Sequence, residues 1–211
     1  CCGNTLHFEN TQCLGCGRRV AFLPDALVVA ALEPLAAQGL RALLPWQWDV
    51  RYRPCRNDTD YQVCNWVVRD DDAEAYCVSC RLNRVIPDLS SARNVQLWRR
   101  IEDAKRRLMY TVLRLGLPFV GRDHGAQGGL GFRFLADTDP GNGFSFHIPP
   151  RERVLTGHED GLITINLDEA DTVAREVMRE RMNEEYRTLL GHFRHESGHY
   201  FWDRVVRDSA W

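Results

Sequence analysis

The sequence predicts an α+β fold in two parts. All eight cysteines lie within the first 80 residues, and the long helical patterns lie after residue 90. Short alternating segments between those helical patterns, separated by turn residues, indicate the strands of a small sheet. The pattern changes near Pro87–Ser91, so we expect an N-terminal module of residues 1–90 and a second domain of residues 91–211.

The composition is that of a globular protein. The chain has 211 residues, of which 44% are hydrophobic and 27% are charged, and its formal net charge is -2. The longest apolar run, Ala26–Leu32, is far shorter than the roughly 20 residues that cross a bilayer, so we expect no membrane partner. No basic-then-apolar leader opens the sequence, which predicts a cytoplasmic location. The near-neutral charge provides no general attraction for nucleic acid.

The N-terminal module is expected to consist mainly of short turns and strands around cysteine pairs. One helical stretch is predicted at Asp25–Leu43, where Leu27, Ala31, Leu35 and Leu43 recur at near-helical spacing. So small a core requires additional cross-links, which the cysteines can provide through metal ions.

The second domain is predicted to begin with a long helix that starts at Ser91 and ends at Gly116, with Pro118 beyond it. The residues that mark its apolar face are Leu97, Ile101, Ala104, Leu108 and Leu115. Five basic residues on this helix are expected on a solvated face, with phosphate binding as the alternative. They are Arg99, Arg100, Lys105, Arg106 and Arg107.

Strands and two further helices are predicted after the long helix. The strands are predicted at Gly131–Leu135, Phe144–Ile148 and Leu162–Leu167. Asp168 is predicted to cap a helix that runs to about Arg181. A final helix is predicted from about Glu184 to Arg207.

The final helix contains the sequence His195-Glu196-Ser197-Gly198-His199, an H-E-x-x-H pattern. Four-residue spacing on a helix places both imidazoles on one face about 6 Å apart, where one metal ion can bind both. At this composition, on the order of 0.01 such patterns are expected by chance. Two surface histidines that flank a glutamate by accident are therefore the weaker interpretation. Gly198 costs about 1 kcal/mol in a helix interior, which indicates close approach by another segment or a substrate.

These residue types support hydrolysis. Zinc held by neutral imidazoles keeps a position for water and lowers the pKa of that water towards roughly 7. Glu196 would be the general base, taking the proton as the water attacks an amide carbonyl. A candidate edge strand at Gly161–Asn166 could align an extended peptide by main-chain hydrogen bonds. We therefore expect a zinc-dependent hydrolase that cleaves a peptide or related amide bond.

A catalytic zinc ion needs a third protein ligand. We expect it beyond Trp211, with His158 or an acid in Asp168–Asp171 as alternatives. His192 and Asp203 lie one turn before and one turn after the two histidines, where they could orient an imidazole N–H. Side chains that could stabilise an oxyanion or bind a substrate carboxylate are Tyr186, Arg187, Arg194 and Tyr200.

The cysteines fall into two sets. The first set contains Cys1, Cys2, Cys13 and Cys16, of which the last two form a C-x-x-C knuckle. The second set contains Cys55, Cys64, Cys77 and Cys80. In a cytoplasmic chain, clustered thiols bind metal more often than they form disulfides, so each set is predicted to hold one structural zinc ion. Disulfides, or a redox-active pair at Cys77 and Cys80, are the alternatives.

A zinc ribbon either stabilises a fold or provides a docking surface. The segment Gly3–Arg19 contains too few basic and aromatic residues to indicate nucleic-acid binding. We therefore favour a protein partner or a purely stabilising role, and keep nucleic acid as the weaker alternative.

Six segments, which together cover nearly the whole chain, resemble a bacterial family of zinc-binding metallopeptidases with an N-terminal zinc ribbon. They are Leu6–Gly17 (LHFENTQCLGCG), Cys64–Trp66 (CNW), Cys80–Leu89 (CRLNRVIPDL), Trp98–Leu108 (WRRIEDAKRRL), Thr156–Asp171 (TGHEDGLITINLDEAD) and Tyr186–Trp202 (YRTLLGHFRHESGHYFW). The resemblance implies zinc ligation by His195 and His199, general-base catalysis by Glu196, and structural zinc at the ribbon cysteines. Family members continue past the position of Trp211 with an acidic helical segment, which implies that the third ligand lies there.

We therefore predict a four-cysteine zinc-ribbon module followed by a small zincin-like domain with an H-E-x-x-H active-site helix, acting on a peptide or protein substrate. One catalytic and up to two structural zinc ions are expected. The alternative is a zinc-stapled protein-docking or scaffolding module in which the H-E-x-x-H site is structural or vestigial. A third interpretation is a protease that acts on proteins attached to nucleic acid, guided by the ribbon and the arginine-rich helix.

Overall fold

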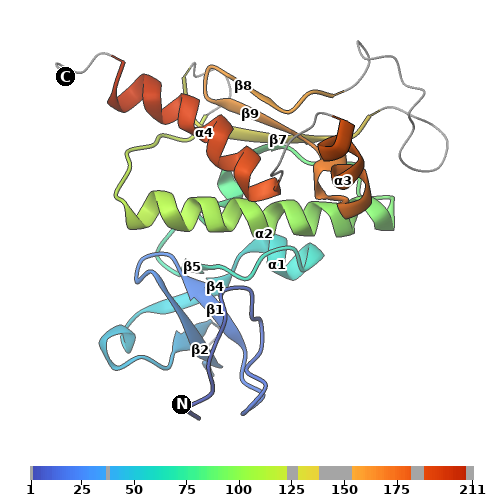
Figure 1. The fold of residues 1–211 in the computed structure, drawn as a ribbon. Coiled ribbons are helices and arrows are strands. Elements are labelled where there is room, and N and C mark those ends of the chain that lie inside the picture. The colour runs from blue at the N-terminus through green and yellow to red at the C-terminus, as the bar shows by residue number, and fades with distance from the viewer. Residues whose placement is uncertain (1, 37–38, 123–127, 138–153, 182–187, 208–211) are drawn as a thin grey trace. The chain divides into compact units, whose positions relative to one another are not determined.

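The computed structural model describes residues 2–36, 39–122, 128–137, 154–181 and 188–207 (Figure 1). The chain divides into two compact units. The first comprises Cys1–Arg81 with Tyr110–Leu115, and the second comprises Leu82–Met109 with Gly116–Trp211. In the part of the chain that the structure describes, no helix has both the length and the apolar character needed to span a bilayer.

The first unit is built on a five-stranded antiparallel meander, in which each strand pairs with the next along the chain. Its strands are β1 (Val20–Leu23), β2 (Val28–Pro34), β3 (Leu40–Ala42), β4 (Arg51–Pro54) and β5 (Val67–Arg69). A 3-10 turn, η1 (Pro45–Gln47), precedes β4, and a short helix, α1 (Arg56–Tyr61), follows it. Inward-facing side chains form a core of Ala21, Leu23, Ala30, Leu32, Ala42, Tyr52 and Val67.

The segment Asp25–Leu43 forms β2 and β3 instead of the predicted helix. Leu27 has a φ of 52° in the turn before β2, a left-handed conformation that does not belong in a helix. Within β2, the β-branched pair Val28–Val29 favours a strand, and Ala30 and Leu32 point into the core with a period of two. The recurrence of leucine and alanine at near-helical spacing spans two strands and a turn, so the helix prediction is wrong.

The second unit contains a four-stranded mixed sheet. Its strands are β6 (Asn83–Val85), β7 (Gly131–Leu135), β8 (Gly157–Glu159) and β9 (Leu162–Asn166), in the order β6-β7-β9-β8. Strands β6, β7 and β9 run parallel to one another, and β8 is antiparallel to β9. The helices of this unit are α3 (Thr172–Arg181), α4 (Leu189–Val205) and most of α2 (Ala92–Arg114).

Two helices cover the same face of this sheet (Figure 1). The rings of Phe132 and Phe134 on β7 contact Phe193 of α4, with centroids 5.7 and 6.5 Å apart. The ammonium group of Lys105 on α2 lies over the same two rings, at 5.7 and 5.5 Å. The side chains that alternate along β7 thus pack α2 and α4 together on one side of the sheet.

Several predicted elements of the second unit are confirmed. The long helix predicted at Ser91–Gly116 is α2, and the strands predicted at Gly131–Leu135 and Leu162–Leu167 are β7 and β9. These segments have strong periodicity and clear turn residues at their ends. The strand predicted at Phe144–Ile148 lies outside the described residues.

Two predicted helix starts are wrong because other residues provide the caps. Asp168 lies inside a 3-10 turn, η4 (Leu167–Ala170), and Asp171 caps α3 instead. The Asp171 carboxylate accepts the amide hydrogens of the first turn of α3 at 3.0 and 3.3 Å. The final helix begins at Leu189, not near Glu184. Thr188 is extended, and its hydroxyl accepts the Gly191 amide hydrogen at 3.0 Å.

Strand β9 lies inside the sheet and β8 forms its edge among the described strands, so the predicted edge strand at Gly161–Asn166 is wrong. Ile163 and Ile165 of β9 are fully buried, as expected for a strand that is paired on both sides. A tight turn at Asp160 and Gly161 joins β8 to β9, with φ values of 45° and 83°. Positive φ at both central residues is the type I′ hairpin geometry, for which Asp-Gly is a preferred sequence.

Replacing Gly161 with alanine is expected to lower the free energy of unfolding by about 2 kcal/mol. The added Cβ would lie 2.5 Å from the carbonyl oxygen of Gly129, and alanine is strained at this positive φ. Urea unfolding of the purified protein measures the change. Gly157→Ala on β8 is the control, because a Cβ added there meets no atom of the described residues within 4 Å. Equal effects of the two substitutions would contradict the steric argument.

An ion pair is buried on α2. Lys105 Nζ lies 2.8 Å from a carboxylate oxygen of Glu102, and both side chains have no exposed surface. Trp98 Nε1 donates a hydrogen bond to the same carboxylate at 3.1 Å, and Asn83 Nδ2 on β6 donates one at 2.7 Å. The Asn83 side-chain oxygen accepts a hydrogen bond from Lys105. The pair is therefore enclosed in a hydrogen-bonded cluster, as a buried charge requires.

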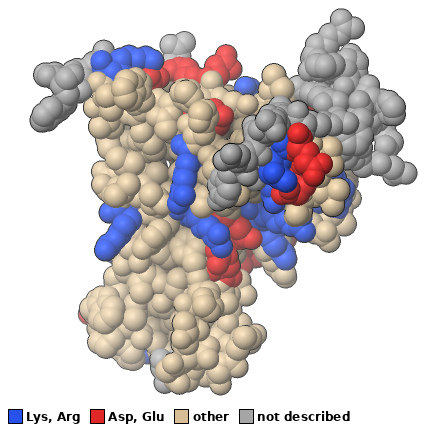
Figure 2. Space-filling model, viewed as in Figure 1, with Lys and Arg blue, Asp and Glu red and all other residues tan. Residues whose placement is uncertain are grey.

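The basic residues of α2 do not share one environment. Lys105 is fully buried and Arg106 is 3% exposed, so the prediction of a solvated face is wrong for these two. Each has an acidic partner three residues earlier, Glu102 and Asp103, which permits its burial. The exposed members of the set are Arg99, Arg100 and Arg107. On the face shown in Figure 2, basic and acidic side chains lie beside one another.

Candidate metal centres

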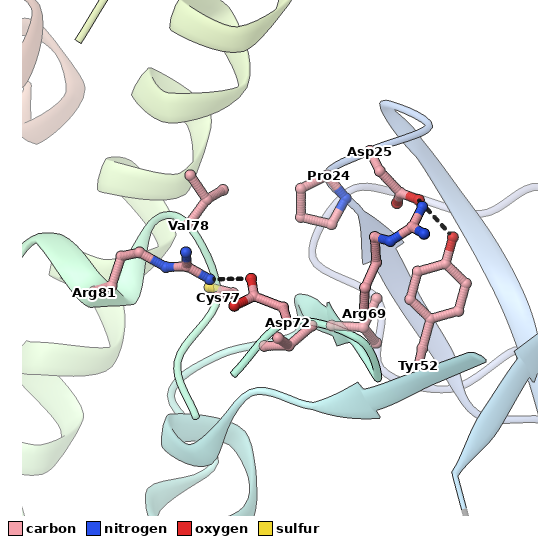
Figure 3. Close-up of a pocket in the computed structure, with 10 residues that line it drawn as sticks. Pro24, Asp25, Tyr52, Arg69, Asp72, Cys77, Val78 and Arg81 are labelled. Atoms are coloured by element: carbon pink, nitrogen blue, oxygen red, sulfur yellow. Dashed lines mark hydrogen bonds and ion pairs between the residues drawn. The ribbon is translucent and has the colours of Figure 1, made fainter. Parts of the chain in front are cut away.

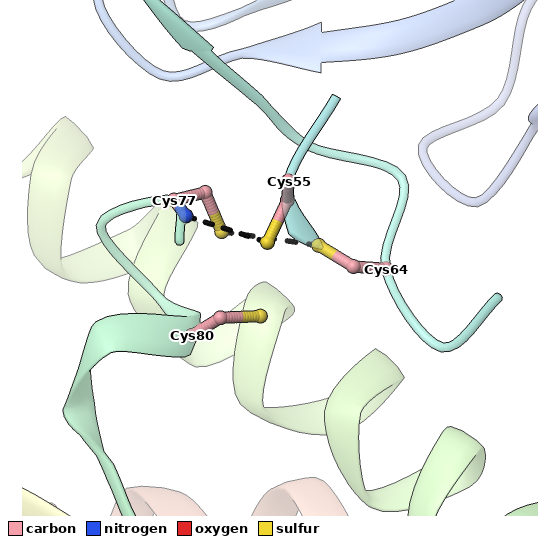
Figure 4. Close-up of side chains that lie close together, drawn as sticks. All are labelled: Cys55, Cys64, Cys77 and Cys80. Carbon is pink, nitrogen blue, oxygen red and sulfur yellow. Dashed lines mark hydrogen bonds between the residues drawn. The ribbon is translucent and has the colours of Figure 1, made fainter. Parts of the chain in front are cut away.

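Four thiols form a buried cluster in the first unit (Figure 4). They belong to Cys55, Cys64, Cys77 and Cys80. Their sulfur atoms all lie within 4.8 Å of one another, and none of the four residues is more than 3% exposed. Cys55 precedes α1, Cys64 follows it, and Cys80 opens the 3-10 turn η2 (Cys80–Leu82). The predicted ligand set thus brings together segments that precede and follow β5 in the chain.

This cluster fits a tetrahedral zinc ion. The amide groups of Cys77 and Trp66 donate to the sulfurs of Cys55 and Cys64, each at 3.4 Å, as peptide groups do around metal thiolates. Burial raises the pKa of Cys77 well above its usual value, and the neighbouring Cys55 thiol raises it further, so thiolates here need a cation.

A second cluster contains Cys2, Cys13 and Cys16, whose sulfurs also lie within 4.8 Å of one another. The sulfurs of Cys2 and Cys13 are 3.5 Å apart. A hydrogen bond from the Arg18 amide lowers the pKa of Cys16 to about 7, which favours the thiolate form that binds metal. The seven described cysteines are free thiols, not disulfides. Cys1, the predicted fourth ligand, lies outside the described residues.

A pocket of about 250 Å³ opens beside Cys77 in the first unit (Figure 3). Its charged wall residues pair with one another, with Arg81 2.7 Å from Asp72 and Arg69 3.6 Å from Asp25. The pocket therefore has no net charge with which to attract an ionic ligand. The Arg81–Asp72 pair spans the loop that contains Cys77, so this wall of the pocket supports the cysteine cluster.

The H-E-x-x-H residues lie on α4 in the second unit. The Nε2 atoms of His195 and His199 are 3.4 Å apart, and their ring planes are inclined by 84°. The carboxylate of Glu196 belongs to the same group, whose potential ligand atoms all lie within 4.8 Å of one another. A Cβ built on Gly198 meets no atom within 4 Å. The predicted close approach of another segment to Gly198 is therefore not found among the described residues, and His195 and His199 are both exposed.

The opposite face of α4 holds the helix on the sheet. Phe193, Ser197 and Tyr200 are buried there. The Phe193 ring packs on the two β7 phenylalanines, and the Tyr200 hydroxyl accepts the Val120 amide hydrogen at 3.3 Å. The two imidazoles thus project from an anchored helix, which gives a metal site more precise geometry than a loop would.

A family model described as "Putative zinc-binding metallo-peptidase" matches residues 94–211, which is more than half of the chain. The chain belongs to this family. A second model, for a zinc-ribbon domain, matches residues 1–91. The resemblance seen in the sequence is thereby confirmed, and zinc binding is supported by both descriptions and by the cysteine clusters.

Relatives of this metallo-peptidase family member occur in mycobacteria. Uncharacterized proteins of Mycobacterium bovis and of two Mycobacterium tuberculosis strains are 38% identical to it over 209 residues. The match covers 99% of this chain and 53% of each relative, so the chain spans about half the length of the curated relatives it matches. No solved structure matches the chain at a significant level.

His158 of the metallo-peptidase unit lies beside the H-E-x-x-H group. It is on β8, with its ring centroid 5.8 Å from that of His199 and the two planes inclined by only 16°. Its Nε2 accepts the Gly161 amide hydrogen at 2.8 Å. Burial lowers the pKa of His158, and the neighbouring His199 lowers it further. Neither ring nitrogen of His158 belongs to the group of His195, Glu196 and His199, whose potential ligand atoms lie within 4.8 Å of one another.

The acidic residues proposed as alternative ligands are engaged elsewhere. Arg93 of α2 lies 3.1 Å from Asp168 and 3.2 Å from Asp171. Burial raises the pKa of Asp168 above its usual value. Glu169 is buried and lies 3.4 Å from His192 Nε2. The sequence offers Glu169 only as one acid of Asp168–Asp171, and it does not predict the pairing with His192 because that pairing joins segments that only the tertiary fold brings together.

Of the remaining predicted site residues, Arg194 is exposed on α4, Tyr186 lies outside the described residues, and others have structural contacts. Asp203 of α4 pairs with Arg207, just beyond the end of the helix, at 2.5 Å. Tyr200, a predicted oxyanion or substrate residue, is buried, and its hydroxyl is bonded to the Val120 amide. Arg187 lies outside the described residues. The structure therefore brings together His195, Glu196 and His199, with His158 next to them.

Proposed function

We propose that this protein is a zinc-dependent hydrolase that cleaves a peptide or a related amide bond. One observation carries the proposal. The imidazoles of His195 and His199 converge within 3.4 Å beside the Glu196 carboxylate, and both histidines remain exposed. A purely structural zinc site is normally enclosed by four protein ligands, whereas a catalytic one keeps an open position.

The residues of α4 would have separate roles in the reaction. His195 and His199 would hold the ion as neutral imidazoles. A bound zinc ion supplies a Lewis acid and lowers the pKa of water. The Glu196 carboxylate takes a proton from the attacking water as the new C–O bond forms. It then gives that proton to the nitrogen as the C–N bond breaks, so the products are a carboxylic acid and an amine.

The edge strand β8 offers a way to align the substrate. It pairs with β9 on one side, and no other described strand pairs with it on the other. An extended peptide could add to that free edge by main-chain hydrogen bonds. His158 of β8 stacks beside His199, so this edge runs next to the proposed catalytic residues.

Metal analysis tests the presence of a separate site on α4. We expect the double substitution His195→Ala, His199→Ala to lower the zinc content by one ion per chain, because the cysteine centres do not involve α4. Elemental analysis of the purified proteins measures the change. The exposed Arg194→Ala on the same helix is the control and should keep the full content. Equal zinc content in the double variant and the parent protein would show that α4 holds no zinc ion and would overturn the proposed function.

A further inference from the structure

His158 is placed to act on the same substrate. Side chains alternate along β8, and His158 stacks on His199, so it points to the face of the sheet on which α4 lies. Its neighbour Glu159 points the other way and has a side chain that is 81% exposed. The strand that forms the edge of the sheet therefore presents one imidazole beside the proposed metal ligands.

The hairpin turn fixes the tautomer of this imidazole. The Gly161 amide donates its hydrogen to His158 Nε2 at 2.8 Å, so Nε2 offers a lone pair. In a neutral imidazole the other nitrogen must then carry the proton. The Nδ1–H group has no acceptor in the described part of the chain. The turn thus holds the ring and leaves one polarised N–H unused.

The other polar groups near α4 have other contacts. The Tyr200 hydroxyl is bonded to the Val120 amide, and His192 faces Glu169. Asp203 is an acceptor and pairs with Arg207. Of the two described side chains predicted to stabilise an oxyanion, Tyr200 is buried and already bonded to the Val120 amide. The other, Arg194, is exposed on α4 and projects about 100° around the helix from His195.

We propose that His158 is a catalytic residue whose Nδ1–H donates a hydrogen bond to the oxygen of the scissile carbonyl as negative charge develops on it. This inference rests on the hydrolase function proposed above and names one residue that would stabilise its transition state. The proton stays on Nδ1 throughout, so His158 adds no step to the proton transfers of Glu196. The same strand would align the peptide and stabilise its reacting carbonyl.

Two substitutions separate the roles of the two ring nitrogens. Glutamine carries its amide at the position of Nε2, so His158→Gln keeps an acceptor for the Gly161 amide and loses the Nδ1–H donor. Asparagine carries its amide at the position of Nδ1, so His158→Asn keeps a donor and loses the turn acceptor. Glu159→Gln on the same strand is the control, because that side chain lies on the opposite face.

The assays are turnover of a fluorogenic peptide that the zinc-loaded protein cleaves, and calorimetric binding of acetohydroxamate. For His158→Gln we expect kcat to fall about 100-fold with little change in KM, as for loss of one oxyanion donor. We expect acetohydroxamate to bind His158→Gln about 10-fold more weakly. His158→Asn should retain kcat within about 10-fold of the parent protein. Zinc content should stay unchanged in both variants.

Other outcomes would overturn the inference in distinguishable ways. Loss of zinc in either variant would make His158 a ligand. A greater loss of kcat in His158→Asn than in His158→Gln would show that His158 acts only by holding the turn between β8 and β9. If the parent protein neither binds acetohydroxamate nor cleaves any peptide, the proposed hydrolase function fails, and this inference fails with it.

Discussion

A Glu196→Gln variant is expected to retain all its zinc and to lose turnover by a factor of about 10²–10⁴. Glutamine has nearly the shape of glutamate, but its amide cannot take a proton from water. The two imidazoles, 3.4 Å apart on the exposed face of α4, do not depend on the Glu196 charge for their position. Steady-state cleavage of a fluorogenic peptide and elemental analysis measure the two quantities on one preparation.

The control for this experiment is Glu159→Gln, which removes an exposed carboxylate from β8 without touching α4. It should leave kcat and zinc content unchanged. Undiminished turnover in Glu196→Gln would exclude Glu196 as the general base. Loss of zinc in Glu196→Gln would instead show that the carboxylate is needed for metal binding.

A Lys105→Ala variant is expected to lower the free energy of unfolding by about 3–5 kcal/mol, the range for removing one partner of a buried ion pair. Both Lys105 and Glu102 have no exposed side-chain surface, so the substitution leaves an uncompensated carboxylate inside the second unit. The hydrogen bonds from Trp98 and Asn83 to that carboxylate remain, but they cannot replace a positive charge. Chemical denaturation followed by circular dichroism gives the value.

Two further variants isolate the charge effect. The exposed Arg99→Ala, on the same helix, should change the free energy of unfolding by no more than about 0.5 kcal/mol. The double variant Lys105→Met, Glu102→Gln removes both charges while keeping similar volumes, and we expect it to recover much of the stability. A Lys105→Ala effect below about 1 kcal/mol would show that water reaches the pair in solution.

The features that the sequence predicts well depend on residues close together in the chain. The helix α2 follows from the repeated apolar positions that end at Gly116, and α4 places His195 and His199 on one face through their four-residue spacing. The second cysteine set is predicted for a different reason. Its members are spread from Cys55 to Cys80, but the chain has only eight cysteines, and assigning four to the first set leaves these four for the second.

The features that could not be predicted from the sequence depend on contacts between segments that are far apart in the chain. The burial of Lys105 requires Asn83 from β6 and two rings from β7, and a basic residue within a run of arginines gives no sign of this. The placement of β8 at the sheet edge depends on which strands pair, which local alternation does not specify. The position of His158 beside His199 therefore becomes visible only in the fold.

The two kinds of proposed metal centre differ in how far apart their expected ligands lie along the chain. His195 and His199 occupy consecutive turns of one helix, so bringing them together costs almost no loop-closure entropy. The cysteine centre runs from Cys55 to Cys80 and requires the intervening loops to close, a cost that metal binding offsets. Chelation at α4 should therefore inactivate a protein that stays folded, whereas chelation at the cysteine centre should unfold the first unit.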